Sequence, residues 1–138
     1  MHKFLENLKP AYGVFSSALG GETSDLVESS LFVDMANYDI VVAYGMASGV
    51  ATGVVISLVL LEATDTAGSG SATTSKTDVF TATATNHTDV LQAEIKAEEL
   101  SAGYRFVGMR MTTDGDATEK VCGLIVQGAP RYAQASLP

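Results

Sequence analysis

The chain has 138 residues, enough for one domain with a sizeable core, and it is 46% hydrophobic but only 17% charged. Its formal net charge is −8, and no two of its eight Lys and Arg residues are adjacent. Because nucleic-acid binding needs clustered cations to contact phosphates, these numbers argue against a nucleic-acid partner. Low charge with many small and β-branched residues favours a protein that covers much of its surface with partners, although a plain β-sandwich can have the same composition.

The first 25 residues differ in pattern from the rest, and we expect residues 1–25 to form an extended N-terminal arm. Apolar residues near the start can share one face of a short helix that Pro10 would end. Two interpretations stay open: the arm packs on its own domain as a lid, or it docks on a neighbouring subunit and so buries its aromatic residues. Its candidate contact residues are Phe4, Leu5, Leu8, Tyr12 and Phe15. On either interpretation, deletion of residues 1–20 should leave the sandwich folded.

The N-terminal segment also bears on where the protein is made. It interleaves charged and apolar residues and has no continuous apolar core, so we do not interpret it as a signal peptide. No later apolar run is long enough to predict a membrane span. We therefore expect a protein that is made and folded in a cytoplasm and has no membrane partner.

From residue 26 onward the hydrophobic pattern favours strands. The most apolar run, Thr52–Glu62, has Ser57 as its only polar interior residue, and its β-branched residues suit a central strand with both faces covered. Several other segments alternate apolar and polar residues, which is the period of a strand. The main predicted strands are Val54–Leu61, Val90–Ala97, Tyr104–Thr112 and Val121–Gln127, with shorter ones at Leu26–Val33, Ile40–Tyr44 and Asp78–Ala84.

The segments between these strands carry loop and turn signals. Thr64–Thr77 is of low complexity and predicts a mobile surface loop, and the small residues of Gly45–Gly53 predict another connection. Asp114-Gly115 is a strong hairpin signal, so we expect the strands on either side of it to be antiparallel neighbours. The expected core includes Leu58, Leu60, Ile95, Met109 and Leu124.

No group of residues has a spacing that indicates catalysis. Cys122 is the single cysteine, lies in an apolar strand pattern without the His or Cys spacing of a zinc site, and is expected to be buried and structural. Glu98 and Glu99 lack a second positioned group for acid–base catalysis and are expected at a solvated corner. We therefore predict no catalytic residue, no metal site, no cofactor and no enzymatic activity.

Together these patterns predict an all-β fold, an antiparallel β-sandwich that is jelly-roll-like. The arm would be followed by a sandwich domain over residues 26–138, which ends in an extended C-terminal tail. Arg131 and Tyr132 are the candidate contact residues of the tail, because Arg and aromatic side chains are favoured as interface anchors.

Four stretches resemble, in order, the jelly-roll head decoration (cement) proteins of tailed double-stranded DNA bacteriophages. They are Val33–Gly45, with Asp-Met before an apolar strand; Val55–Asp65, with a strand running into a polar loop; Tyr104–Thr112, with Arg105-Phe106 where the family has Arg-Tyr; and Gly123–Gly128, followed by Pro130-Arg131 and a final Pro138. The resemblance covers residues 26–138. It departs from the family's pattern at Phe106 and in the Pro–Arg order of the tail.

The resemblance implies a non-enzymatic structural virion protein. Such a protein lies on the outer capsid surface, often as a homotrimer, binds the major capsid protein and stabilises the shell, after synthesis in the cytoplasm of the bacterial host. Two alternatives stay open: another phage part on the same fold, such as a tail, fibre or head-completion protein, and a carbohydrate-binding jelly roll. The predicted loops lack the exposed aromatic residues typical of sugar sites. A hydrolytic enzyme has the least support, because no Ser, Cys or His arrangement provides a nucleophile.

Overall fold

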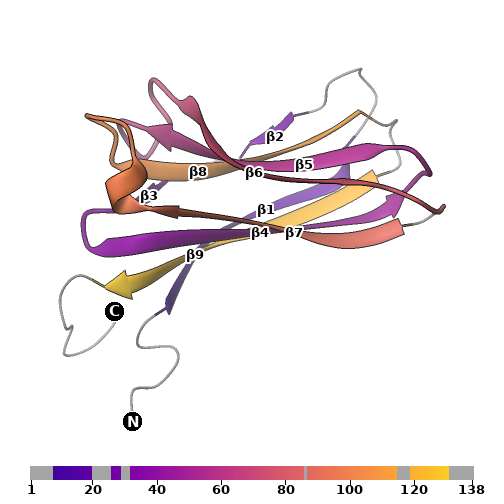
Figure 1. Ribbon diagram of the computed structural model, residues 1–138, viewed down its shortest axis with the longest axis horizontal. Coiled ribbons are helices and arrows are strands. Elements are labelled where there is room, and N and C mark those ends of the chain that lie inside the picture. The colour runs from indigo at the N-terminus through magenta and orange to yellow at the C-terminus, as the bar shows by residue number, and fades with distance from the viewer. Residues whose placement is uncertain (1–7, 20–25, 29–31, 86, 115–118, 131–138) are drawn as a thin grey trace, which may run out of the picture.

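The computed structural model describes residues 8–19, 26–28, 32–85, 87–114 and 119–130, and it confirms the all-β prediction. Two antiparallel sheets lie face to face as the layers of a sandwich (Figure 1). A short 3-10 helix, η2 (Ala97–Glu99), follows β7 and holds Glu98 and Glu99, the two residues that were expected at a corner. The strands are β1 (Leu8–Leu19), β2 (Leu26–Glu28), β3 (Val33–Asp34), β4 (Tyr38–Val50), β5 (Val55–Ala63), β6 (Ala72–Thr81), β7 (His87–Lys96), β8 (Phe106–Thr113) and β9 (Glu119–Pro130).

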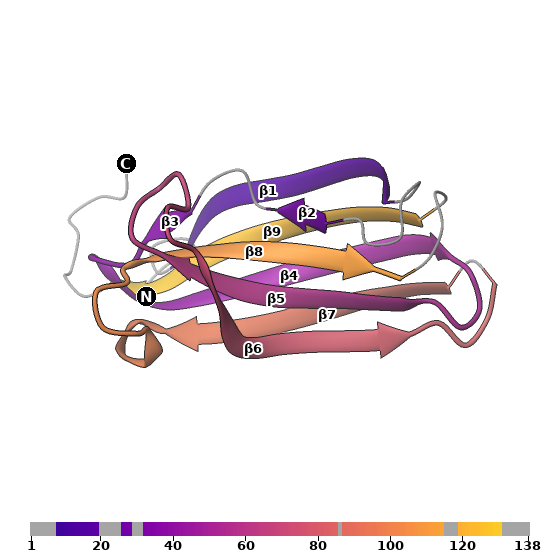
Figure 2. The same cartoon turned by 90° about the horizontal axis from the view of Figure 1, so that it is seen from above.

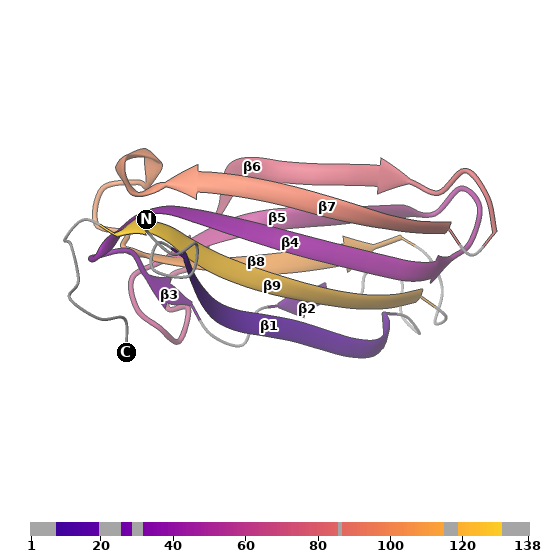
Figure 3. The same cartoon turned by 90° about the horizontal axis from the view of Figure 1, so that it is seen from below.

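The strands pair in the nested order of a jelly roll. Sheet A has the order β1-β9-β4-β7 (Figure 3), and sheet B has the order β2-β8-β5-β6, with β3 also paired to β8 (Figure 2). Along the chain, β1 therefore pairs with β9, β2 with β8, β4 with β7 and β5 with β6. This inward wrapping of successive pairs is the double Greek key that places jelly rolls among the two-sheet folds.

Strand β5 is the interior strand that the apolar run predicted, and it is covered on both faces. It pairs with β6 on one side and β8 on the other, and its last six residues, 58–63, are all buried. Leu58 and Leu60 belong to the main core between the sheets, together with Ile95 and Met109. Val59, Leu61 and Ala63 belong to a second, smaller cluster with Phe32 and Phe106.

Glycines let large side chains lie close against both sheets. A Cβ atom at Gly108 of β8 would lie 2.7 Å from the ring of Phe32, and one at Gly68 would lie 2.5 Å from the same ring. Between the sheets, a Cβ at Gly123 of β9 would lie 2.0 Å from the Met109 methyl carbon. Because such distances are shorter than any real Cβ contact, these positions need glycine if their neighbours are to stay in place.

The edge strands β6 and β7 lie side by side along one margin of the sandwich (Figures 2 and 3). The Gln92 backbone N–H of β7 donates a hydrogen bond of 2.9 Å to the Asp78 carboxylate of β6. A side chain of one sheet thereby satisfies an edge donor of the other, which is one way to keep an edge from pairing with a further strand.

The N-terminal segment corrects the expectation of an arm outside the sheet. Residues 8–19 form β1, which pairs with β9 along its length, whereas residues 1–7 and 20–25 lie outside the described residues. Pro10 does not end a helix. It lies in an edge strand at a shift of register, between the pairs Pro10–Val126 and Tyr12–Ile125, and edge strands and bulges are where sheets tolerate a proline.

The turn at Asp114 corrects a second expectation. Strands β8 and β9 are not neighbours, because β8 belongs to sheet B and β9 to sheet A. Asp114 instead binds within its own sheet: its carboxylate accepts a hydrogen bond of 2.6 Å from the Val55 N–H at the start of β5. Turn chemistry predicts a reversal of the chain but not the sheet that the next strand joins.

Three further expectations need correction. Residues 72–77, expected in a loop, form the first part of β6, and residues 45–50 extend β4. Leu124 is not a core residue, since it is 41% exposed, while Gly123 and Ile125 on either side are buried. The run around Leu124 is apolar at every position, so alternation could not assign its faces.

Replacement of a core residue tests the assigned faces. We expect Leu58→Ala to lower the free energy of unfolding by about 2–5 kcal/mol, because Leu58 is fully buried and its truncation leaves a cavity between the sheets. The matched change Leu124→Ala, on the outward face of β9, should cost less than about 1 kcal/mol. Urea unfolding of both variants measures the difference, and equal losses would contradict the assignment.

Removal of β1 tests its place in sheet A and reverses the earlier expectation for this segment. Deletion of residues 1–19 should destabilise the sandwich by more than about 2 kcal/mol, because β9 loses the hydrogen bonds of one edge. Thermal unfolding followed by circular dichroism gives the result. An unchanged unfolding temperature would mean that β1 adds nothing to the fold.

Candidate interaction surface

The outward face of sheet A carries a continuous set of apolar side chains. Along β4, residues 40–48 alternate between core and surface, and the outward positions are 40, 42, 44, 46 and 48. The register places these beside outward positions of β7 and β9, so that each row crosses three strands. Reading across β9, β4 and β7, the rows are Cys122–Met46–Val90, Leu124–Tyr44–Gln92 and Val126–Val42–Glu94. We call these nine residues, with Ile40, the sheet-A face; Figure 3 shows the strands β9, β4 and β7 that carry it.

Large apolar side chains on this face are unusually exposed. Tyr44 is 39% exposed, Met46 47%, Val90 54% and Leu124 41%. Among the residues whose side-chain burial is described (32–85, 88–114 and 120–130), these are four of the five large hydrophobic side chains that are exposed, and the fifth, Val79, lies on β6 of sheet B. Single exposed hydrophobic residues are normal, but a contiguous patch of them marks an interaction site.

Charge is sparse on the same face, and cations stand at both of its ends. At the outward positions within residues 40–48, 88–96 and 120–126, the charged residues are Glu94, Lys96 and Lys120, which together carry +1. The whole chain carries −8. Lys96 pairs in register with Ile40 at one end, and Lys120 pairs with Ser48 at the other.

A hollow of about 240 Å³ lies at the Lys120 end of the face, lined by Met46, Ala47, Ser48, Thr88, Lys120, Val121 and Cys122. Cys122 is half-buried there, so the expectation of a fully buried structural cysteine is only partly met. Within the described part of the chain, no three His, Cys, Asp or Glu side chains are close enough to share a metal ion.

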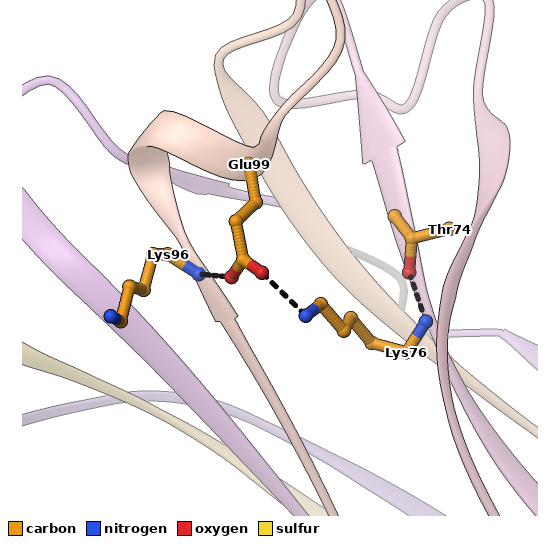
Figure 4. A network of polar contacts seen from close by, with 4 residues as sticks. All are labelled: Thr74, Lys76, Lys96 and Glu99. Atoms are coloured by element: carbon orange, nitrogen blue, oxygen red, sulfur yellow. Dashed lines mark hydrogen bonds and ion pairs between the residues drawn. The ribbon is translucent and has the colours of Figure 1, made fainter.

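The corner around η2 holds a polar network (Figure 4). Glu99 accepts a hydrogen bond of 2.5 Å from the Lys76 ammonium of β6 and one of 2.8 Å from the Lys96 backbone N–H. These two hydrogen bonds hold the pKa of the Glu99 carboxyl below its ordinary value, and the bond from Lys76 has the larger effect. The network ties the corner after β7 to the neighbouring sheet, which agrees with the predicted solvated corner and with a structural role for Glu99.

A polar hollow of about 300 Å³ lies beside this network, lined by Glu62, Thr73, Thr74, Ser75, Lys76, Ile95, Glu99 and Ser101. Glu62 is only 6% exposed, and its carboxylate accepts a hydrogen bond of 2.9 Å from the Ser101 N–H. The lining contains no aromatic side chain. It therefore lacks the flat apolar surface against which a sugar ring stacks.

The predicted contact residues are only partly within the described structure. Leu8, Tyr12 and Phe15 belong to β1, and Phe15 pairs in register with Cys122 of β9. Phe4, Leu5, Arg131 and Tyr132 lie outside the described residues. Sequence analysis missed the sheet-A face. Its signal was present, because Ile40–Tyr44 and Val121–Val126 are apolar at both odd and even positions, as in strands that are covered on both faces.

Comparison with known proteins supports the fold. The sequence matches no protein-family model, and no curated protein matches it. The structure is similar to a protein chain in the cryo-EM structure of Broad bean stain virus, with a TM-score of 0.54 and 6% sequence identity. The alignment covers 100% of this chain and 96% of the viral chain. The structure is also similar to the vertex protein of PRD1, with a TM-score of 0.51 and 12% identity over 88% and 97%. A carbohydrate-binding module of the β-sandwich type aligns with a TM-score of 0.49 and 9% identity, over 86% of this chain and 52% of that one.

These likenesses identify the fold as a jelly roll of the kind found in viral capsid proteins. At such low identity they show the fold alone. Among the described residues, no helix has the length and apolar content to span a membrane.

The polar corner makes stability depend on pH. Since the pKa of Glu99 is lowered in the folded state, its carboxylate stabilises the fold above the ordinary pKa of 4.5, and that contribution is lost as the pH falls through the folded-state pKa. We expect Glu99→Gln to reduce the drop in unfolding temperature between about pH 6 and about pH 3. The exposed neighbour Glu98 supplies the control, and Glu98→Gln should leave the drop as in the unmodified protein. Equal drops in all three proteins would contradict the role of Glu99.

Proposed function

We propose that this protein is a structural component of a bacteriophage virion, a decoration protein that binds the outer surface of the capsid and stabilises the shell. The observation that carries the proposal is the sheet-A face, a contiguous apolar surface with little charge on a chain of net charge −8. Such a surface suits stable contact with another protein and is a liability on a free monomer. The jelly-roll fold is in keeping with this role but does not by itself assign it.

In this proposal the protein has no enzymatic activity and no cofactor. Its partners are the major capsid protein and further copies of itself, in a homotrimer, and it is made in the bacterial cytoplasm before it binds the head. The polar hollow beside Glu99 has the character of a structural corner, since its charged groups are engaged with one another and with backbone N–H groups.

A physical reason for such a protein is the pressure of packaged DNA, which pushes the subunits of the shell apart. A protein that binds only the expanded shell stabilises that state by mass action, and the gain increases with the concentration of the protein relative to its Kd. Acidic charge on the remaining surface would also keep the protein from binding the nucleic acid inside.

Co-sedimentation with expanded, undecorated heads tests the proposal. The protein should bind to saturation, bind unexpanded heads at least about tenfold more weakly, and raise the temperature at which the heads break open. Unexpanded heads and bovine serum albumin serve as the two controls. If the protein binds neither form of head and does not change their stability, the decoration proposal is wrong.

A further inference from the structure

The two sheets differ in how their outward apolar residues are covered. On sheet B, the chain itself supplies the cover: Phe32 packs on the outward cluster, and Val59 and Leu61 are at most 9% exposed. On sheet A, Tyr44 and Leu124 lie at the centre of the face and remain about 40% exposed. At residues 32–85, 88–114 and 120–130, where side-chain burial is described, no side chain covers them as Phe32 covers sheet B. Among these residues, the sheet-A face is therefore the apolar surface that stays open.

The distribution of charge indicates what covers this face. Two copies of a chain with net charge −8 repel each other over most of their surfaces. The sheet-A face itself holds one charged residue, Glu94, and with Lys96 and Lys120 at its ends this side of the sandwich carries +1, so it is where a copy meets little repulsion. Lys96 and Lys120, at opposite ends of the face, also attract the carboxylates of an acidic neighbour. An apolar centre with cationic ends thus complements another copy of the same acidic protein.

We infer that the sheet-A face packs against a second copy of this chain. The proposed function includes self-association, and this inference names the surface through which it occurs. The inference therefore rests on the proposed function. Strand β4 lies at the centre of the contact, with β7 and β9 on either side. A capsid subunit in place of the second copy is the competing occupant.

Substitution at the centre of the face tests the inference. Light scattering should give the intact protein a mass at least twice that of the 14.4 kDa chain. Leu124→Glu should raise the Kd of self-association at least about tenfold, because it places an unpaired charge in the contact. Val79→Glu is the matched control: Val79 is 52% exposed on sheet B, and its substitution should leave the mass unchanged. Circular dichroism checks that each variant folds. If Leu124→Glu does not fold, Tyr44→Lys at the same face is measured in its place.

The single cysteine gives a second readout on the unmodified protein. Cys122 lies on the sheet-A face beside the hollow, half-buried in the isolated chain. Its reaction with N-ethylmaleimide should therefore be slow when the protein is concentrated and speed up on dilution. In Leu124→Glu the reaction should be fast at both concentrations. A rate that does not depend on concentration in the intact protein would contradict a contact at this face.

The same variants on heads separate this inference from the proposed function. If Leu124→Glu dissociates the oligomer and the intact protein binds no head, the self-association face stands and the decoration proposal fails. If Leu124→Glu keeps the oligomer but loses head binding, the face binds the capsid and the inference is overturned. A monomeric intact protein, or an equal shift in mass for Leu124→Glu and Val79→Glu, also overturns it.

Discussion

The need to cover β5 on both faces governs the arrangement of the molecule. Six consecutive buried residues in one strand require apolar neighbours above and below it. Sheet A supplies one side, with Met109 fitted against Gly123. Phe32 supplies the other, and it can approach only because Gly68 and Gly108 have no side chains. The burial of β5 on both of its faces thus explains both the two-layer sandwich and the small cluster around Phe32 on the outside of sheet B.

This arrangement also accounts for the difference between the two outer surfaces. The segment before β4 lies across sheet B, where the N–H of Phe32 donates a 3.2 Å hydrogen bond to the Thr66 carbonyl. Arg105, on the adjoining strand end, pairs with Asp34 at 2.9 Å. The outward apolar cluster of sheet B is therefore covered by its own chain. Sheet A also has apolar outward residues, and the exposure of Tyr44, Met46, Val90 and Leu124 is the basis for the proposed structural role.

The sequence predicted the fold class because strand periods and the apolar run at β5 are local signals. It did not predict which face of β9 is buried, since Leu124 and Ile125 are alike in hydrophobicity and the two faces differ only in tertiary contacts, such as that of Met109 at Gly123. The helix-ending sign of Pro10 was ambiguous, because an edge strand accepts proline equally well. Apolar residues on both faces of Ile40–Tyr44 and Val121–Val126 are a local signal, but only the register between these distant strands places them side by side on the sheet-A face.

The nested pairing of strands has a consequence for how the chain reaches this structure. Strand β1 is made early, but its pairing partner β9 is made more than 100 residues later, as the pair Leu8–Gly128 shows. The hydrogen bonds between β1 and β9 can therefore form only after β9 has left the ribosome. Closure of sheet A therefore carries the entropic cost of a loop that spans most of the residues between β1 and β9. Until then, β4 lacks β9 beside it and its apolar residues are open to other chains. During folding, the period before β9 docks is therefore the one in which aggregation through β4 is most favoured.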